Sequence, residues 1–390
     1  MTGSNDMSAR LEDIIASASG GAEQGPFQII GGGTKHFLGR EASGAPLSVA
    51  EHRGIVSFEP KELVITARCG TRLAEIESIL AERHQMLPFE PPHFGAEATL
   101  GGTICAGLSG PRRPYTGSAR DFVLGVRLLN ERGGQRFGGQ VMKNVAGYDV
   151  GRLMVGAMGT LGILLEVSLR VLPIPAEEIT LVREHTPAEA IDVMNTWAGR
   201  PLPLSGACFD SERLYVRLSG AASAMRSARG QLGGELLEPT DGPGLDGPEG
   251  PDSSSNRDNN GNDHDRDRNH HHRFWYDVRE QRHAFFPEMT ASEPLWRLSV
   301  PPASPPLPLS GRWFIEWGGG QRWLRSDLPG IEIRKAVSAV RGHATLFRGG
   351  DRKGEVFHPL APGLARLHQR VKQAFDPHGL FNPGRLYSTL

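Results

Sequence analysis

The chain of 390 residues contains only three cysteines and carries almost no net charge. Cys69, Cys105 and Cys208 are far apart and form no C-x-x-C arrangement, which excludes a disulfide framework and an iron–sulfur site built from this chain alone. With 43 basic and 44 acidic residues the net charge is −1, so the basic excess typical of nucleic-acid-binding proteins is missing. We therefore expect a protein of a reducing compartment that has no nucleic-acid partner.

Long apolar runs are also missing. No run approaches the roughly 18 apolar residues that a membrane span needs. Residues 1–10 are polar and lack the apolar core of a signal peptide. We expect a cytoplasmic protein without a direct membrane span, which would be peripheral to the inner membrane only through a partner.

Two segments of the chain are rich in glycine but do not match the common phosphate-binding motifs. Residues 99–103 read TLGGT and residues 156–162 read GAMGTLG. Neither is a G-x-G-x-x-G fingerprint, and no G-x-x-x-x-G-K-[ST] occurs in the chain. Glycines at this density allow positive φ angles and let several backbone N–H groups face one anion, as binding of a diphosphate requires. The spacing alone leaves open that these segments are only tight turns in an α+β domain.

The order of the glycine segments along the chain narrows this choice. Residues 30–35 (IGGGTK) come first, and 99–103, 117–121 (GSARD) and 156–162 follow. Residues 375–385 read FDPHGLFNPGR. This series resembles the FAD-binding domain of the vanillyl-alcohol oxidase, or PCMH-type, flavoproteins and the closing signature of that family.

Two further runs resemble a narrower group within the family. Residues 143–150 (KNVAGYDV) and 342–348 (GHATLFR) are similar to segments of the FAD-binding subunits, or E subunits, of glycolate oxidases. The resemblance covers nearly the whole chain except residues 240–273. It implies an α+β fold, in which a two-part PCMH-type FAD-binding domain carries a smaller ferredoxin-like α+β cap domain.

The length of the chain predicts two domains. We expect a FAD-binding domain in residues 1–175, which ends at Pro173 and Pro175, a cap domain in 176–335, and a C-terminal segment, 336–390, that returns to the FAD-binding domain. The apolar pattern of the cap predicts a split β-α-β-β-α-β order. Its expected elements are strand 178–184, helix 187–198, strands 205–209 and 213–218, helix 221–232 and strand 234–238, then strand 295–300 and a hairpin of 313–317 with 322–325.

The pattern of the first domain is also regular. It predicts a helix around Leu11, strands at 27–30, 55–58 and 63–67, a helix that begins at a Thr71 cap, a hairpin of 122–130 with 135–137, and a strand at 163–172. In the last strand apolar and polar residues alternate, which predicts one buried face and one polar face carrying Glu166, Ser168 and Arg170.

Residues 240–273 differ from the rest of the chain. Gly, Pro, Ser, Asn, Asp and Arg dominate them, and no large apolar residue lies between Leu245 and Phe274. Such a segment cannot offset its ordering entropy by burial, so we expect a disordered insertion in the cap. Its histidine tract, 264–272, does not match the calcium-loop pattern, and we expect no functional metal there.

The resemblance implies which residues surround FAD. They are Gly31, Gly32, Gly33, Thr34, Lys35, Leu100, Gly101, Gly102, Thr103, Gly117, Ser118, Asp121, Gly156, Gly159, Thr160, Gly162 and Arg385. Lys35 is either a charge complement to the diphosphate or a solvated surface lysine. Family members with covalent flavin carry His where this chain has Thr34, and His36 is displaced by two residues. We therefore expect non-covalent FAD.

The catalytic residues stay unassigned. Self-sufficient 2-hydroxyacid dehydrogenases of the family carry a pair of metal-binding histidines, whereas this chain has His343 alone, with His358, His368 and His378 scattered. The ordinary interpretation of these histidines is a capping or surface role. His343 and Arg348 are the candidates for a clamp on a hydroxyacid. Arg348 and Arg385 are candidates, by resemblance only, for a positive group near flavin N1.

Three hypotheses for the function follow from the resemblance. In the first, the chain is the FAD-binding subunit of a glycolate oxidase (glycolate dehydrogenase) complex that oxidises glycolate to glyoxylate. It then passes electrons between a second FAD-containing subunit, which oxidises the substrate, and an iron–sulfur subunit. The alternatives are a self-sufficient FAD-dependent D-2-hydroxyacid dehydrogenase of the D-lactate type and a flavin-free structural subunit. The missing histidine pair favours the first.

Overall fold

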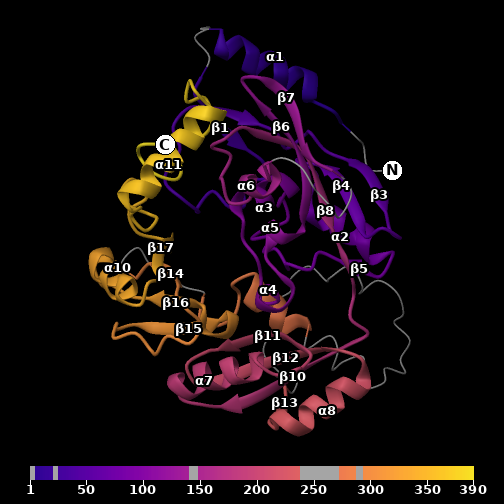
Figure 1. Ribbon diagram of the computed structural model, residues 1–390, viewed down its shortest axis with the longest axis vertical. Helices are drawn as coiled ribbons and strands as arrows, with labels where there is room; N and C mark the ends of the chain where they lie inside the picture. Colours follow the sequence, from indigo (N-terminus) through magenta and orange to yellow (C-terminus); the bar gives the residue numbers. More distant parts are fainter. Residues whose placement is uncertain (1–4, 21–24, 140–147, 238–271, 287–292) are drawn as a thin grey trace.

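The structure is a computed structural model that describes residues 5–20, 25–139, 148–237, 272–286 and 293–390. Its described strands form a five-stranded sheet, an eight-stranded sheet and two two-stranded pairs. Figure 1 shows the five-stranded sheet in the upper half of the molecule and the eight-stranded sheet in the lower half. Helices lie on both sheets, so the expected α+β fold is confirmed.

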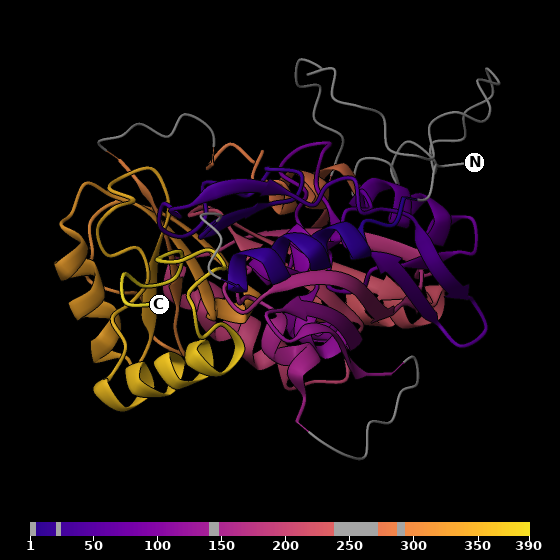
Figure 2. The ribbon, with the colours of Figure 1, turned by 90° about the horizontal axis from the view of Figure 1, so that it is seen from above.

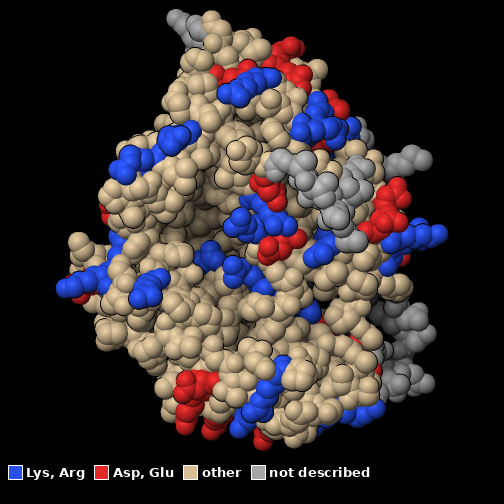
Figure 3. Space-filling model, viewed as in Figure 1, with Lys and Arg blue, Asp and Glu red and all other residues tan. Residues whose placement is uncertain are grey.

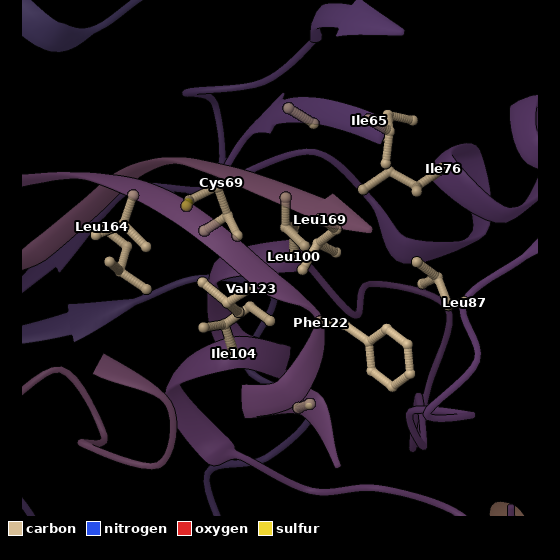
Figure 4. Close-up of a cluster of buried hydrophobic side chains, with 14 of the residues drawn as sticks. Ile65, Cys69, Ile76, Leu87, Leu100, Ile104, Phe122, Val123, Leu164 and Leu169 are labelled. Carbon is tan, nitrogen blue, oxygen red and sulfur yellow. The ribbon is translucent and has the colours of Figure 1, made fainter. Parts of the chain in front are cut away.

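The five-stranded sheet is antiparallel throughout, in the order β3-β4-β8-β6-β7. Its strands are β3 (Ile55–Glu59), β4 (Val64–Arg68), β8 (Ile163–Arg170), β6 (Val123–Asn130) and β7 (Gly133–Gly138). Helix α1 (Ser8–Ser19) packs on one face through Leu11 and Ile15. Helices α2 (Leu73–Ala81) and α3 (Leu100–Ala106) pack on the other, where Figure 4 shows Leu100 and Ile104 among the apolar residues of the sheet.

The expected polar face of β8 is wrong, because this strand is buried on both sides. Seven of its eight residues are buried, and Glu166 is only 5% exposed. A bulge in its pairing with β6 skips Leu165, so Ile163 and Leu165 face α1 while Val167 and Leu169 face α2. Glu166 is tolerated inside because Arg127 and Arg136 pair with its carboxylate at 3.3 and 3.0 Å.

The helix predicted after residue 71 is present, but Thr71 does not cap it. Arg72 is the N-cap of α2 and makes no side-chain capping bond. The buried hydroxyl of Thr71 accepts a hydrogen bond from the Gly54 N–H at 2.9 Å and donates to the Gly54 carbonyl at 3.3 Å. Thr71 thus ties the start of β3 to the start of α2, a long-range role that local sequence spacing does not reveal.

The remaining elements of this half are short. They are β1 (Phe27–Ile30), which pairs in parallel with β2 (Ala45–Ser48), β5 (Gln85–Met86), which pairs with β9 (Leu172–Pro173), and helices α4 (Arg113–Thr116), α5 (Ala119–Phe122) and α6 (Val150–Met154). The polypeptide leaves β1 directly into the glycines at 31–33, so this parallel pair sets the position of the first glycine loop.

The eight-stranded sheet has the order β13-β10-β12-β11-β15-β16-β14-β17. The first four strands with two helices form the predicted split β-α-β-β-α-β unit, in the 4-1-3-2 order of a ferredoxin-like fold. The elements are β10 (Glu177–Glu184), α7 (Pro187–Ala198), β11 (Leu204–Phe209), β12 (Arg213–Gly220), α8 (Ala222–Leu232) and β13 (Glu235–Leu236), then β14 (Leu295–Ser299), β15 (Arg312–Glu316), η1 (Trp317–Gly319), β16 (Gln321–Arg325), α10 (Gly330–Ala339) and β17 (His343–Arg348).

A buried ion network joins the two halves. The Glu90 carboxylate pairs with Arg112 at 3.1 Å and with Arg217 of β12 at 2.8 Å, and Arg112 also pairs with Glu178 of β10. The side chains of Arg112 and Arg217 are only 5% and 4% exposed. Because each charge has an opposite neighbour, the network can lie between the halves without an unpaired group.

The C-terminal segment contacts both halves. Strand β17 pairs with β14, so residues 343–348 belong to the eight-stranded sheet rather than returning to the first half. Beyond it, α11 (Pro362–Phe375) leads to residues that meet β1, where Phe381 bridges Phe27. Figure 2, in which the molecule is seen from above, shows α11 beside the first half. The division of the chain at residues 175 and 335 stays a proposal.

Two segments that the sequence singled out fall outside the described residues. They are most of the insertion at 240–273 and most of the run at 143–150. In the described part of the chain, no helix is long and apolar enough to cross a membrane.

Candidate cofactor site

The glycine segments meet at one cavity in the first half of the molecule. It contains about 880 Å³ of empty space, open solvent included. Three loops form its walls, namely residues 31–36 after β1, 99–106 at α3, and 158–164 before and within β8. Asn382 and Arg385 of the C-terminal signature complete it. Of the expected site residues, the cavity is lined by Gly31, Gly32, Gly33, Thr34, Lys35, Gly101, Gly102, Gly159, Gly162 and Arg385.

The first loop has no room for side chains at two of its glycines. A Cβ on Gly32 would lie 1.5 Å from the Glu97 carbonyl oxygen, and one on Gly31 would lie 2.6 Å from Thr99 Oγ1. Within the described residues, the N–H groups of Gly32, Gly33 and Thr34 donate to no protein acceptor. Backbone donors that line a cavity and lack partners are suited to an anionic ligand.

The second wall is held against the sheet by close backbone packing. Gly101 lies so near β4 that its Cβ would be 2.8 Å from that of Cys69, and its N–H donates to the Cys69 carbonyl at 2.8 Å. Thr99 caps α3 by accepting from the Gly102 N–H at 3.3 Å. Gly101 therefore presents bare backbone to the cavity because no side chain fits there, whereas a Cβ on Gly102 would meet only Thr99 Oγ1, at 3.2 Å.

Asn382 joins the first loop to the third. Its Oδ1 accepts a hydrogen bond from the Ile29 N–H at 2.8 Å, and its Nδ2 donates to the Met158 carbonyl at 2.7 Å. A Cβ on Gly159, where φ is +69°, would lie 2.7 Å from the same Nδ2. Asn382 was not among the expected site residues, although it lies in the same FDPHGLFNPGR run as Arg385.

The rest of that run anchors Asn382. The buried Asp376 carboxylate accepts from the N–H groups of Leu380 and Phe381 at 2.7 and 3.0 Å. Lys372 of α11 donates to Asp376, to the Phe381 carbonyl and to the Thr160 carbonyl. The C-terminal signature therefore holds the cavity walls at residues 27–29 and 158–160 in place by hydrogen bonds.

The charged side chains at the cavity are all basic. Burial lowers the pKa of Lys35 to about 8, opposed by the charge of Glu280. Partial burial and then Arg385 lower the pKa of His36, which favours its neutral form. The Arg385 guanidinium donates to the Arg40 and His36 carbonyls at 2.7 and 3.0 Å. Positive charge beside partnerless backbone donors fits a diphosphate. In the view of Figure 3, several Lys and Arg side chains also surround a hollow between the region of α11 and that of α3 and α6.

Seven of the expected site residues do not line the cavity. Leu100 and Thr103 are buried residues of α3 itself. The Thr160 hydroxyl donates to the Ala157 carbonyl at 2.7 Å. Gly156 donates to the Ile104 carbonyl and packs against Gly107. Gly117, Ser118 and Asp121 form the start of α5, where Ser118 and Asp121 make a capping box. Thr160, Ser118 and Asp121 thus have local structural roles, whereas the buried Thr103 hydroxyl has no hydrogen-bond partner among the described residues.

The two candidates for a substrate clamp lie apart. His343 and Arg348 are the first and last residues of β17, which separates them by roughly 16 Å at the usual rise of a strand. A small hydroxyacid cannot contact both at once, and a catalytic role for either residue stays a prediction. Neither side chain lines the cavity.

The structure brings a second histidine beside His343, which the sequence did not indicate. The ring of His358 accepts from the N–H of Ala344 at 3.3 Å through Nδ1, and its Nε2 lies 3.2 Å from the Ser338 hydroxyl. Burial, Arg297 and His358 lower the pKa of His343. Because both His358 nitrogens are engaged, the pair is not arranged as a metal site. Within the described residues no three His, Cys, Asp or Glu side chains gather as metal ligands.

Comparison with known proteins agrees with this geometry. Residues 9–137 match the model of a family described as FAD binding domain, and residues 349–386 match the C-terminal domain of FAD-linked oxidases. The chain is 44% identical over 383 residues to the glycolate oxidase subunit GlcE of Escherichia coli K12, covering 98% of this chain and 97% of that one. The chain belongs to the GlcE family. The resemblance inferred from the sequence motifs is thereby confirmed.

More distant relatives match parts of this GlcE-family chain. The glycolate oxidase subunit GlcD of Bacillus subtilis is 30% identical over 165 residues, or 42% of this chain and 35% of that one. A D-lactate dehydrogenase of Anaerostipes hadrus is 30% identical over 141 residues, or 36% and 29%. Among solved structures, alkyldihydroxyacetonephosphate synthase superposes with a TM-score of 0.61 at 12% identity, covering 97% of this chain and 75% of that one. That likeness confirms the PCMH-type fold.

Proposed function

We propose that the chain is the FAD-binding subunit of a glycolate oxidase complex and that it holds FAD without a covalent bond. Its cavity combines three glycine walls with Lys35 and Arg385, in a chain of the GlcE family. This combination carries the proposal, because the glycines bring bare N–H groups to an anion inside a cavity whose charged side chains are basic. Thr34 stands where a covalent histidine would be expected.

Backbone N–H groups of the first glycine loop would bind the diphosphate of FAD. The N–H groups of Gly32, Gly33 and Thr34 would face the diphosphate, while Asn382 keeps their loop in register with residues 158–160. Bound FAD supplies hydride acceptance and the release of single electrons. The partners in our proposal are a second FAD-containing subunit, which oxidises glycolate to glyoxylate, and an iron–sulfur subunit that receives the electrons.

A self-sufficient D-2-hydroxyacid dehydrogenase is the second candidate. The partial match to a D-lactate dehydrogenase favours it, but that match covers only 36% of this chain. The separation of His343 from Arg348 and the engaged ring of His358 speak against it, because a hydroxyacid needs a cationic clamp close to a base or metal.

The flavin content of the purified chain tests the proposed cofactor. We expect a yellow protein with about one FAD per chain, and acid precipitation should leave the flavin in the supernatant. Flavin in the pellet would show a covalent link, for which His36 would be the first candidate because it lines the cavity. A colourless chain that takes up no added FAD would support the structural-subunit hypothesis.

A further inference from the structure

Lys35 is a half-buried cation at the cavity. Its Nζ donates to the His93 carbonyl at 3.1 Å and lies 3.4 Å from the Thr34 hydroxyl. Among the residues that the structure describes, no carboxylate forms an ion pair with it. A lysine has three N–H donors, so at least one remains for a ligand. Burial of an unpaired ammonium is costly unless an anion arrives to balance it.

The carboxylate whose charge opposes the lowering of the Lys35 pKa has other partners. Glu280, at the end of the helix at 272–279 in the second half of the molecule, accepts from the N–H groups of His93 and Phe94 at 3.1 and 2.8 Å. It also pairs with Arg279 at 2.9 Å. Glu280 therefore fixes the loop whose carbonyl holds Lys35, but leaves the ammonium itself unneutralised.

The two arginines considered from the sequence are less suited to contact a ligand. Both terminal nitrogens of Arg385 donate hydrogen bonds, one to the Arg40 carbonyl and one to the His36 carbonyl. Arg348 lies over the rings of Phe37 and Phe94, at 3.8 and 4.7 Å, and donates to Gln281 at 3.1 Å. Arg348 also does not line the cavity. Of these three cations, Lys35 is the one that has both access to the cavity and a donor left for a ligand.

The surroundings of Lys35 indicate which part of a bound FAD it would meet. The partnerless N–H groups of the glycine loop precede it in the chain, and its Nζ reaches the His93 carbonyl, with the Phe94 ring centroid 5.8 Å away. Met158 and Ala106 line the cavity too. An apolar and aromatic end next to a glycine-walled anion site suits a flat ring system beyond a diphosphate.

We propose that the Lys35 ammonium contacts the flavin ring of FAD and favours its reduced form. The inference rests on the proposed function. Two-electron reduction by a donor, dithionite in the test below, brings two electrons and one proton to the N5 side of the ring and leaves one negative charge shared by N1 and the C2 oxygen. An ammonium in a poorly solvated position stabilises that charge.

The test compares FAD-loaded wild type with Lys35→Met, Lys35→Arg and the control Lys61→Met, an exposed lysine in the β3–β4 turn. The midpoint potential is measured by dye equilibration during reductive titration, and affinity for ADP by calorimetry. We expect Lys35→Met to weaken binding of reduced relative to oxidised FAD by roughly tenfold, equal to ~30 mV for a two-electron couple. Lys35→Arg should restore most of the potential, and ADP affinity should change less than twofold.

The outcomes separate this inference from the proposed function. If the wild-type chain binds no FAD, the proposed function fails. If Lys35→Met binds FAD with an unchanged potential, only the role of Lys35 is contradicted. A similar loss of ADP and FAD affinity without a change in potential would place Lys35 at the diphosphate and also overturn the inference. Should Lys35→Met not fold, Lys35→Gln removes the charge with a polar side chain and is judged by the same values.

Discussion

Asn382 accepts a hydrogen bond from the Ile29 N–H across 353 residues of sequence, at 2.8 Å. This bond and the one to the Met158 carbonyl fix the distance between two walls of the cavity. The C-terminal signature of the family therefore acts at the cofactor site, although most of its residues do not line the cavity. The position of Asn382 explains how a segment near the end of the chain can control a site built from residues 28–164.

We predict that Asn382→Ala weakens FAD binding at least tenfold and lowers the melting temperature. The change leaves the Ile29 N–H and the Met158 carbonyl without partners, at about 1–3 kcal/mol for each buried group. Asn195→Ala is the matched control, because Asn195 donates to the Ile191 and Gly318 carbonyls at 2.8 and 3.0 Å, away from the cavity. Fluorescence titration with FAD should show normal affinity for the control. Equal losses of affinity in both variants would contradict the role of Asn382.

Gly102→Asp should abolish FAD binding, whereas Gly102→Asn should retain part of it. The two side chains have nearly the same shape, so the difference isolates a negative charge placed beside the diphosphate. The added Cβ would lie 3.2 Å from Thr99 Oγ1, which costs both variants similarly. Calorimetry with FAD provides the affinities. Equal binding by the Asp and Asn variants would show that the diphosphate lies elsewhere.

Glu90 should make the stability of the protein dependent on acid pH. Burial alone would raise the pKa of Glu90, but Arg217 and Arg112 outweigh it and lower the pKa to about 2. A depressed carboxyl pKa gives stability that is present above the ordinary value of 4.5 and is lost as pH falls toward 2. The melting temperature of the wild type should therefore fall between pH 5 and 3.

Glu90→Gln is the variant that tests this network. At pH 7 it should destabilise the protein by ~3–5 kcal/mol, because it removes the carboxylate that pairs with the buried Arg217 and leaves Arg112 with Glu178 alone. Its melting temperature should then vary less than that of the wild type between pH 5 and 3. Glu97→Gln breaks an exposed pair with Arg72 and should cost less than ~1 kcal/mol. A Glu90→Gln variant as stable as Glu97→Gln would show that the network contributes little to joining the halves.

Lys35 should destabilise the protein in the absence of FAD. The groups that face it are Glu280 and His93, with Glu77 and Arg279 behind them. Its pKa in the folded chain, about 8, is below the ordinary 10.5, so the destabilisation is full below pH 8 and is lost as pH rises toward 10.5. Such a shift corresponds to on the order of 3 kcal/mol.

The melting temperature of the flavin-free protein measures this effect of Lys35. At pH 7 we expect Lys35→Met to melt several degrees higher than the wild type, and the difference should shrink between pH 8 and 10. Lys61→Met, at an exposed position, should match the wild type throughout. A Lys35→Met variant that melts below the wild type at pH 7 would contradict an unneutralised ammonium at this site.

Much of the fold was predictable because its patterns are local. The α7 helix, for example, begins at a capping box of Thr186 and Glu189, and the order of elements from β10 to β13 follows from apolar periodicity. The polar face of β8 was predicted wrongly because a bulge in its pairing with β6 depends on the neighbouring strand. The capping role of Thr71 was wrong because a long-range contact to Gly54 takes its hydroxyl.

The candidate site was predictable where glycine itself lines the cavity. Gly31, Gly101 and Gly159 could be recognised from the glycine-rich segments of the sequence, and the structure shows that a side chain would collide at each of them. Asn382 could not be assigned in this way, since its partners lie at distant positions in the chain. The approach of His358 to His343 was missed for the same reason.

The most direct test of the account is anaerobic mixing of the purified, FAD-loaded chain with glycolate or D-lactate while the flavin band near 450 nm is followed, a band expected from the cofactor itself. We predict that neither acid bleaches the flavin of the isolated chain, because the described residues that line its cavity include no clamp for a hydroxyacid, and that glycolate bleaches it once the partner subunits are added. Rapid bleaching by either acid in the pure chain, persisting after treatment with a chelator, would contradict the account and identify a complete dehydrogenase.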